Sequence, residues 1–456
     1  MAGKNEADLS SKPVGKLLIS LAVPTITAQI VNMLYNIVDR IYIGQGVGKT
    51  ALTGVGVSFP ILILISAFSS LIGMGGAPRA SIRMGQKDND GAERILGNCF
   101  VTLLSISLIL TVFFRTFSSQ LLMMFGASPD TLPYGLAYIN IYVLGTVFVQ
   151  LSLGLNAFIT AQGFSRYSMV TVLIGAVSNI ILDPIFIFGF GMGVKGAALA
   201  SVISQALSAF WVLRFLNGKA TSLRLRREHM RFSPQVMLPV LALGIAPFIM
   251  QSTESLVNIV FNRSLQQYGG DIAVGSMTIL TSVMQLVMMP VSGLTQGAQP
   301  IISYNYGAQN NDRVKKAFRL LLCSSLAYTL SFWVIVQVFP EMVVRIFNSD
   351  PALLQTASWA MRIYLGASFM LGVQIACQQT FVALGQAKYS LFLALLRKII
   401  LLLPLIWLLP QLISDQVFAV FLAEPIADMI ATLTTLMLFL LQFPKLLAKN
   451  QQPGGR

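Results

Sequence analysis

Apolar runs of about 20 residues or more follow one another along the whole chain, separated only by short polar segments. A helix needs about 20 residues to cross a hydrocarbon core of roughly 30 Å. The apolar runs 61–64 and 399–403 show no period of two, which argues against the alternating strands of an outer-membrane barrel. The pattern predicts an all-α integral membrane protein with about twelve spanning helices, at residues 17–43, 51–77, 95–116, 132–161, 167–190, 195–217, 236–266, 272–300, 317–339, 352–383, 389–411 and 416–442.

The two halves of the chain repeat each other at a fixed offset. Gly75 and Gly297 lie 222 positions apart, and the same spacing relates many Gly, Pro, Tyr and Asn residues: Pro78 and Pro300, Asn89 and Asn311, Tyr142 and Tyr364, Tyr167 and Tyr389. Six spans return the chain to its starting side, so we expect two parallel six-helix lobes related by a pseudo-two-fold axis along the membrane normal. The amino-terminal lobe would be 1–217, a basic linker 218–234 and the carboxy-terminal lobe 235–456. Two such bundles can rock about a site between them; a duplication kept only for architecture is the alternative.

Composition excludes several classes of protein. Of the 456 residues 55% are hydrophobic and 11% charged, and the mean hydropathy is +0.73. Soluble domains carry about 25% charged residues, so soluble enzymes and nucleic-acid readers are poor candidates and we expect no nucleic-acid partner.

The net charge of +14 comes from 31 Lys and Arg against 17 Asp and Glu. In a membrane protein a basic excess marks cytoplasmic loops. Bases gather in 219–231 and after the second and eighth spans, including Arg79, Arg83, Arg94, Arg313, Lys315 and Lys316. We therefore expect a multi-pass protein of the inner membrane, surrounded by lipid and monomeric, with both termini in the cytoplasm.

Histidine and cysteine offer no site for a metal or a disulfide. Cys99, Cys323 and Cys377 all fall in apolar segments, and His229, the single histidine, has no partner in its Arg-rich surroundings. A membrane enzyme would need clustered His, Asp or Cys, and a channel would need a repeated filter loop. Neither is present, so we expect no enzyme activity and no cofactor.

Acidic residues inside the spans are candidate functional groups, because a charge in lipid costs roughly 3 kcal/mol or more. Five acids lie there: Asp39, Asp183, Glu254, Glu424 and Asp428. Polar residues accompany them at helical spacing, among them Asn32, Tyr35 and Asn36 before Asp39, Asn179 before Asp183, and Gln251 and Asn258 around Glu254. For the amides and hydroxyls alone, hydrogen bonding between helices is the simpler explanation.

The carboxy-terminal half also carries two bases within a span. Arg397 and Lys398 lie about nine residues into it, roughly 13 Å from its start at the helical rise. Glu424 and Asp428 are four residues apart in the last span and, with Glu254, are their plausible partners. A structural ion-pair network and a substrate site both remain open interpretations.

Four short motifs resemble those of a known transporter family. They are YNIVDRIYIG at 35–44, NIILD at 179–183, GAQP at 297–300 and NYGA at 305–308. Their order and spacing over essentially the whole chain resemble the multidrug and toxic compound extrusion (MATE) transporters, most closely the bacterial branch with acids in the first and fifth spans. The resemblance implies two six-helix lobes and cation-coupled export of diverse, often cationic drugs, with Na⁺ or H⁺ as the coupling ion.

The resemblance assigns the coupling site to Asp39, Asn179 and Asp183, with Ser201 where that branch usually has Thr. Supporting positions match Tyr35, Asn36, Tyr138 and Asn156. We expect Asp39 and Asp183 to lie together in a dry pocket, where two carboxylates either resist joint ionisation or share Na⁺. The choice between Na⁺ and H⁺ stays open.

The carboxy-terminal lobe holds the candidate substrate groups. Glu254 matches an acid that other branches use in this lobe, but the tenth span has Gln374 and Gln378 and no acid, so a complete ion site is not expected there. An adaptable apolar wall could include Met277, Met284, Met288 and Met289, with Gln251 and Arg397 nearby; ordinary packing is the alternative. The nearest rival function is a flippase for a lipid-linked oligosaccharide, which would want several cationic residues in the cavity.

Overall fold

The structure is a computed structural model that describes residues 8–348 and 350–451. Within these residues the chain is helical and forms no strand. The all-α fold predicted from the hydrophobic pattern is therefore confirmed.

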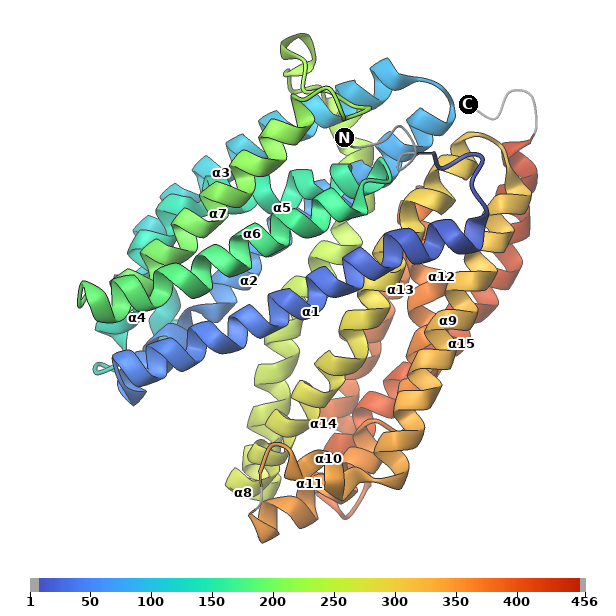
Figure 1. The fold of residues 1–456 in the computed structure, drawn as a ribbon. Coiled ribbons are helices and arrows are strands. Elements are labelled where there is room, and N and C mark those ends of the chain that lie inside the picture. The colour runs from blue at the N-terminus through green and yellow to red at the C-terminus, as the bar shows by residue number, and fades with distance from the viewer. Residues whose placement is uncertain (1–7, 349, 452–456) are drawn as a thin grey trace.

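The first half of the chain supplies six spans, coloured blue to green in Figure 1. The fourth span is one apolar helix in three segments, and the fifth ends in a π-helical turn. The helices are α1 (Val14–Gly46), α2 (Lys49–Gly85), α3 (Asn89–Met124), α4 (Leu132–Tyr142) with η1 (Val143–Gly145) and α5 (Thr146–Ala161), α6 (Ser165–Pro184) with η2 (Ile185–Gly189), and α7 (Val194–Leu216).

The second half repeats this arrangement. Its helices are α8 (Pro234–Gly307), α9 (Asn311–Val338), the short α10 (Pro340–Arg345), α11 (Pro351–Tyr364) with η4 (Ser368–Met370) and α12 (Leu371–Ala383), α13 (Ala387–Leu395) with the π-helical η5 (Leu396–Leu402) and α14 (Leu403–Leu412), and α15 (Gln416–Asn450). Ten helices of the described residues are long and apolar enough to cross a membrane, and the pair bent by 45° between α11 and α12 adds an eleventh. Because α8 is two helices that meet at Gly270, the number of spans is twelve, as predicted.

The repeat is visible in the backbone as well as in the sequence. Gly270, where α8 breaks at φ 63°, is the counterpart of Gly48 between α1 and α2, at φ 105°. Lys87 and Gln309 are also 222 positions apart, and both adopt the left-handed conformation that non-glycine residues rarely enter. Each precedes a residue that caps the next helix: the side chain of Asp88 accepts from Gly91 N, and that of Asn310 accepts from Arg313 N.

The two lobes meet through glycines on α2 and α8, which contact the backbones of α8, α2 and α1. A Cβ atom at Gly85 would overlap the carbonyl oxygen of Tyr304, and one at Gly307 would overlap that of Ile82. Residue 304 is the counterpart of 82, so these two contacts are related by the pseudo-two-fold axis. A second related pair brings Gly75 against Val240 and Gly244, and Gly297 against Leu21 and Ala22.

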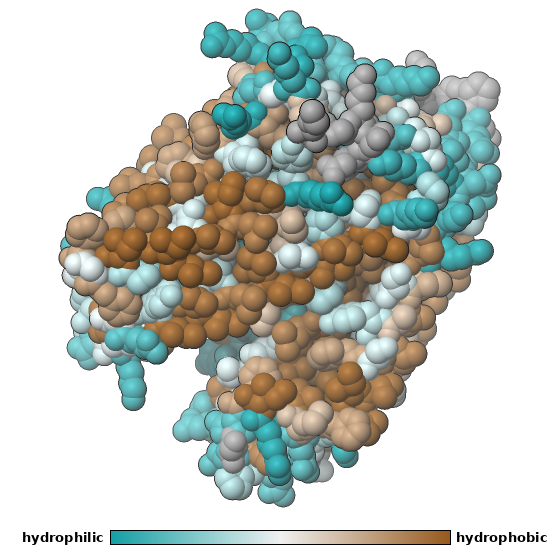
Figure 2. Space-filling view, viewed as in Figure 1, coloured by the Kyte–Doolittle hydropathy of each residue, from teal (hydrophilic) through white to brown (hydrophobic). Residues whose placement is uncertain are grey.

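These contacts lie toward the side where the described chain begins and ends. Arg313 donates to the carbonyl oxygens of Leu9 and Lys12, and Asn450 donates to that of Tyr306. On the other side the lobes diverge (Figure 1), and Figure 2 shows a recess between them. The lobes are thus closed on the terminus side and open on the opposite side.

The outer surface carries an apolar belt between polar ends (Figure 2). Large side chains such as Leu108, Phe210 and Leu440 are each more than 60% exposed, as expected of a surface that faces lipid. The polar ends carry the bases. Those at 219–231 lie in the linker between α7 and α8, as predicted, but those after the second and eighth predicted spans do not lie in loops. Arg79 and Arg83 lie in α2, Arg94 in α3, and Arg313, Lys315 and Lys316 in α9, because these helices continue beyond their apolar segments.

Candidate functional site

Asp39 of α1 and Asp183 of α6 face each other inside the amino-terminal lobe. Asp39 is 8% exposed and Asp183 is fully buried, and their carboxyl groups are close enough to share a hydrogen bond. Asp183 occupies the last turn of α6, directly before Pro184 and the π-helical η2. The sequence-based expectation that these two acids lie together agrees with this arrangement.

Asn179 and Ser201 complete a ring of oxygen atoms around the two carboxylates. The Asn179 amide donates to Asp183 Oδ1 and Ser201 Oγ, at 3.3 Å each. Three buried oxygens in this pocket have no hydrogen-bond partner: Asp39 Oδ1, Asp183 Oδ2 and Asn179 Oδ1. Buried oxygens are rarely left unpaired, and carboxylate and amide oxygens suit a hard cation, so the donor set fits a small cation or a proton.

Three tyrosines enclose this pocket. Tyr35 of α1 and Tyr138 of α4 lie beside the acids, and the Tyr138 hydroxyl bonds Ser201. The Tyr142 ring stacks on that of Tyr138 at 5.8 Å between centroids. Tyr142 was not among the predicted site residues, although its match with Tyr364 in the repeat was a signal for it.

The other two predicted supporting residues lie elsewhere. The Asn36 amide folds back onto the Asn32 carbonyl of its own helix. The Asn156 amide donates to the carbonyl oxygen of Ser168, about three turns before Asn179 on α6. Asn36 shares α1 with Asp39, and Asn156 of α5 contacts α6, the helix that carries Asn179 and Asp183.

Arg397 lies in a second charged cluster, inside the carboxy-terminal lobe. Its side chain is 5% exposed; Nε donates to Asp428 Oδ1 at 2.6 Å and Nη2 to Glu424 Oε1 at 3.3 Å. The base comes from the π-helical η5 and both acids from α15, where a spacing of four residues places them on one face. Glu424 Oε2 is buried and has no hydrogen-bond partner.

Lys398, the next residue of η5, points to a different helix. Its ammonium nitrogen lies 3.1 Å from Glu254 Oε2 of α8. The lysine side chain is 9% exposed, but that of Glu254 is 54% exposed in the middle of a span. One to two turns earlier on α8, Phe248 contacts Phe68 across the lobes. Glu254 therefore lies on the segment of α8 near which the lobes begin to part, and its side chain is exposed.

The sequence model of the MatE family matches this chain twice, at residues 24–185 and 247–408. The chain belongs to the MatE family.

Similar proteins agree with this membership. The chain is 26% identical over 418 residues to the multidrug export protein MepA of Staphylococcus haemolyticus (strain JCSC1435), covering 91% of this chain and 92% of that protein. It is 24% identical over 430 residues to MepA of Staphylococcus aureus (strain N315), covering 93% and 94%.

Solved structures share the fold. A crystal structure of MATE in the bent conformation superposes with a TM-score of 0.92 at 20% identity, covering 98% of this chain and 100% of that chain. An outward-facing multidrug resistance MATE family transporter of the MOP superfamily superposes with a TM-score of 0.90, also at 20% identity, covering 97% and 99%. The chain is thus a multi-pass membrane protein with the two-lobe MATE architecture.

The two MatE repeats carry different charges at equivalent positions. Tyr142 beside Asp39 corresponds to Tyr364, which lies beside the acids of the second cluster. The position of Asp39 is taken by Phe261, whose ring contacts that of Tyr364 at 5.9 Å. Each lobe therefore has a polar interior at the same place. Among the described residues, Asp39 and Asp183 form no ion pair, while the acids of the second cluster are paired with bases.

The methionines and glutamines predicted for a substrate wall divide between core and recess. Met277 is 2% exposed and lies in the core of the second lobe, and Gln374 and Gln378 are also buried there. Met284 packs against the same core, and Met284 and Met288 pack against a smaller cluster of Val291, Leu371 and Ile375. Met289 is half-buried, whereas Gln251 is exposed one turn before Glu254. Gln251 is therefore the predicted residue that accompanies Glu254 at the recess.

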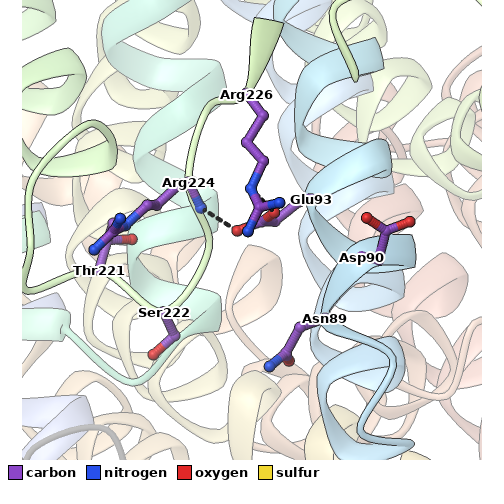
Figure 3. Close-up of a pocket in the computed structure, with 7 residues that line it drawn as sticks. All are labelled: Asn89, Asp90, Glu93, Thr221, Ser222, Arg224 and Arg226. Carbon is purple, nitrogen blue, oxygen red and sulfur yellow. Dashed lines mark hydrogen bonds and ion pairs between the residues drawn. The ribbon is translucent and has the colours of Figure 1, made fainter. Parts of the chain in front are cut away.

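The linker between the repeats is fastened to the first lobe. Glu93 of α3 accepts from the Arg224 backbone N–H at 3.0 Å and pairs with the Arg226 guanidinium at 2.7 Å, beside a surface pocket of about 410 Å³ (Figure 3). His229, expected to have no partner, lies 3.1 Å from Asp90. This pocket is at the terminus side, away from the acids inside the spans, so it is not part of the candidate transport site.

Proposed function

We propose that this MatE protein is a cation-coupled antiporter that exports diverse, often cationic drugs by alternating access of its two lobes. The observation that carries the proposal is the pair of buried carboxylates, Asp39 and Asp183, with three unpaired oxygens and no salt-bridged base beside them. Such a pocket binds a cation, Na⁺ or H⁺, more readily than it stays empty and charged. The multidrug export proteins to which the chain is similar support the choice of drugs as substrates.

The coupling follows from the position of this pocket in one lobe. An ion that binds one arrangement of the lobes better than the other shifts the equilibrium between them, and a drug with the opposite preference shifts it back. Drug and ion would therefore cross in opposite directions, with one chain sufficient as a monomer because both lobes and the recess belong to it. The basic residues on the terminus side support an orientation in the inner membrane with both termini in the cytoplasm. In that orientation the open recess would face outward.

A lipid-linked oligosaccharide flippase is less well supported. A pyrophosphate group needs unpaired cationic residues in the recess. Arg397 and Lys398, the two adjacent bases of η5, are both paired with acids. The recess thus presents the carboxylate of Glu254 and no unpaired base from this cluster.

Ethidium efflux from cells tests the coupling site. We expect Asp39→Asn and Asp183→Asn each to abolish efflux at matched expression, because an amide cannot take up a proton or neutralise Na⁺. Asp130→Asn is the matched control, since Asp130 is an exposed acid outside the helices. Full efflux by both pocket variants would contradict the assignment.

Everted membrane vesicles with imposed gradients identify the ion. Ethidium uptake driven by a pH gradient alone, or by a Na⁺ gradient alone, assigns H⁺ or Na⁺. If neither gradient drives uptake in the wild type, cation coupling is wrong whatever the variants do.

A further inference from the structure

The carboxy-terminal cluster contains one more acid than base. The acids are Glu254, Glu424 and Asp428, and the bases are Arg397 and Lys398. After these ion pairs have formed, Glu424 Oε2 is buried without a hydrogen-bond partner. A buried carboxylate oxygen without a partner is costly, so an acceptor for one further donor is built into this lobe.

Lys398 has two carboxylates within its range. It holds Glu254 at 3.1 Å, and it also interacts electrostatically with Glu424. A lysine ammonium carries three donors on a flexible four-carbon stem, so it can exchange one acceptor for another without leaving the lobe. Arg397, fixed by two acids, lacks this freedom.

Glu254 is the acid that a ligand can reach. More than half of its side chain is exposed, while those of Glu424 and Asp428 are 3% and 2% exposed. A cation that arrives from the recess thus meets a carboxylate already occupied by the ammonium of Lys398.

We propose that Glu254 is a binding site for monovalent organic cations, and that Lys398 is a tethered competitor which the bound cation displaces onto the free oxygen of Glu424. The inference deepens the proposed function and depends on it. Lys398 stays paired as it moves from one carboxylate to another, and the bound cation balances the acid that is in excess, which lowers the cost of desolvating the site. An anion of the same shape would not bind more tightly once Lys398 is displaced, since it would meet the negative charge of Glu254.

Binding of two ions of the same shape and opposite charge tests the exchange. Tetraphenylphosphonium and tetraphenylborate are titrated into the purified full-length protein in detergent micelles by calorimetry, with empty micelles subtracted. In Lys398→Met we expect the Kd for tetraphenylphosphonium to fall about tenfold, because the competitor is gone. The Kd for tetraphenylborate should rise or stay unchanged.

Glu424→Gln separates the exchange from a merely structural effect. With Lys398 present, we expect the variant to weaken tetraphenylphosphonium binding about tenfold, since the displaced lysine loses its second acceptor. In the Lys398→Met background the same substitution should have no effect, so the two changes are non-additive. Thermal unfolding of each variant in the same micelles shows that it is folded.

Three results would overturn the inference. They are an unchanged Kd in Lys398→Met, equal tightening of both ions, or a Glu424→Gln effect that persists without Lys398. If the wild type binds tetraphenylphosphonium and the variants give any of these three results, the inference is wrong but the proposed function still stands. A wild type that binds neither ion and exports no ethidium overturns both.

Discussion

Arg397 and Lys398 are neighbours in sequence, but they lie in different surroundings. Arg397 is held between two acids with almost no exposed surface, whereas the partner of Lys398 is half exposed. Removing one member of a buried pair leaves an unpaired charge, which costs about 3–5 kcal/mol, while exposed pairs contribute about 0–1 kcal/mol. The two bases should therefore contribute very differently to stability.

We predict that Arg397→Met destabilises the folded protein by about 3–5 kcal/mol, because Glu424 and Asp428 would face each other without a base. Lys398→Met should cost less than about 1 kcal/mol. Thermal unfolding of the detergent-solubilised protein measures both. Lys388→Met, at an exposed lysine of α13, is the control, and equal losses in the Arg397 and Lys398 variants would contradict the difference.

The sequence was sufficient to find the charged residues of both sites but not to pair them. Asp39 and Asp183 stand out because each is an acid within an apolar run. The partner of each base depends on how η5 is rotated against α8 and α15, and a π-helical turn there changes the rotation that a regular α-helix would give. Tyr142 is one aromatic residue among many in apolar surroundings, and its match with Tyr364 in the repeat does not say which pocket it lines.

At the scale of elements, hydropathy located every span but not its ends. The second span was predicted at 51–77, whereas α2 runs from Lys49 to Gly85. Apolar residues mark the part of a helix that lies in lipid, while its ends are set by capping residues such as Asp88 and Asn310. The basic residues were placed in loops for the same reason.

Besides Glu93, a buried amide of the first lobe holds the linker. Gln162 Oε1 accepts from the backbone N–H groups of Ser222 and Leu223 and from the Thr221 hydroxyl, at 2.8–2.9 Å. The Leu223 side chain is fully buried in the core of the same lobe. The linker is thus a fixed part of the first lobe and not a free tether.

We predict that Gln162→Leu releases this segment, because two backbone N–H groups lose their acceptor at about 1–3 kcal/mol each. Trypsin should then cleave after the bases at 219–231 about tenfold faster than in the wild type, since cleavage follows the population of the open form. Asn217→Ala is the control, because the Asn217 amide bonds only its own helix. Unchanged cleavage in Gln162→Leu would show that other contacts hold the linker.

At the scale of the whole molecule, the glycine contacts define how the lobes close on the terminus side. Gly85 on Tyr304 and Gly307 on Ile82 form one symmetric pair, in which helix backbones approach more closely than any side chain would allow. Ser81, one turn before Gly85, is fully buried here and donates to the Pro300 carbonyl. Access to position 81 therefore reports whether the lobes are closed on this side.

We predict that Gly307→Ala opens the terminus side, because its Cβ atom would overlap the Ile82 carbonyl oxygen. Overpacking of this kind costs about 1–3 kcal/mol, which shifts the balance between two arrangements about 5- to 150-fold. The measurement is the rate at which a polar maleimide alkylates a Ser81→Cys protein whose three native cysteines are replaced by serine; we expect at least about a fivefold increase. Gly56→Ala, where an added Cβ meets nothing within 4 Å, is the matched control and should leave the rate unchanged. An unchanged rate in Gly307→Ala, at wild-type thermal stability, would mean that this contact does not keep the lobes closed.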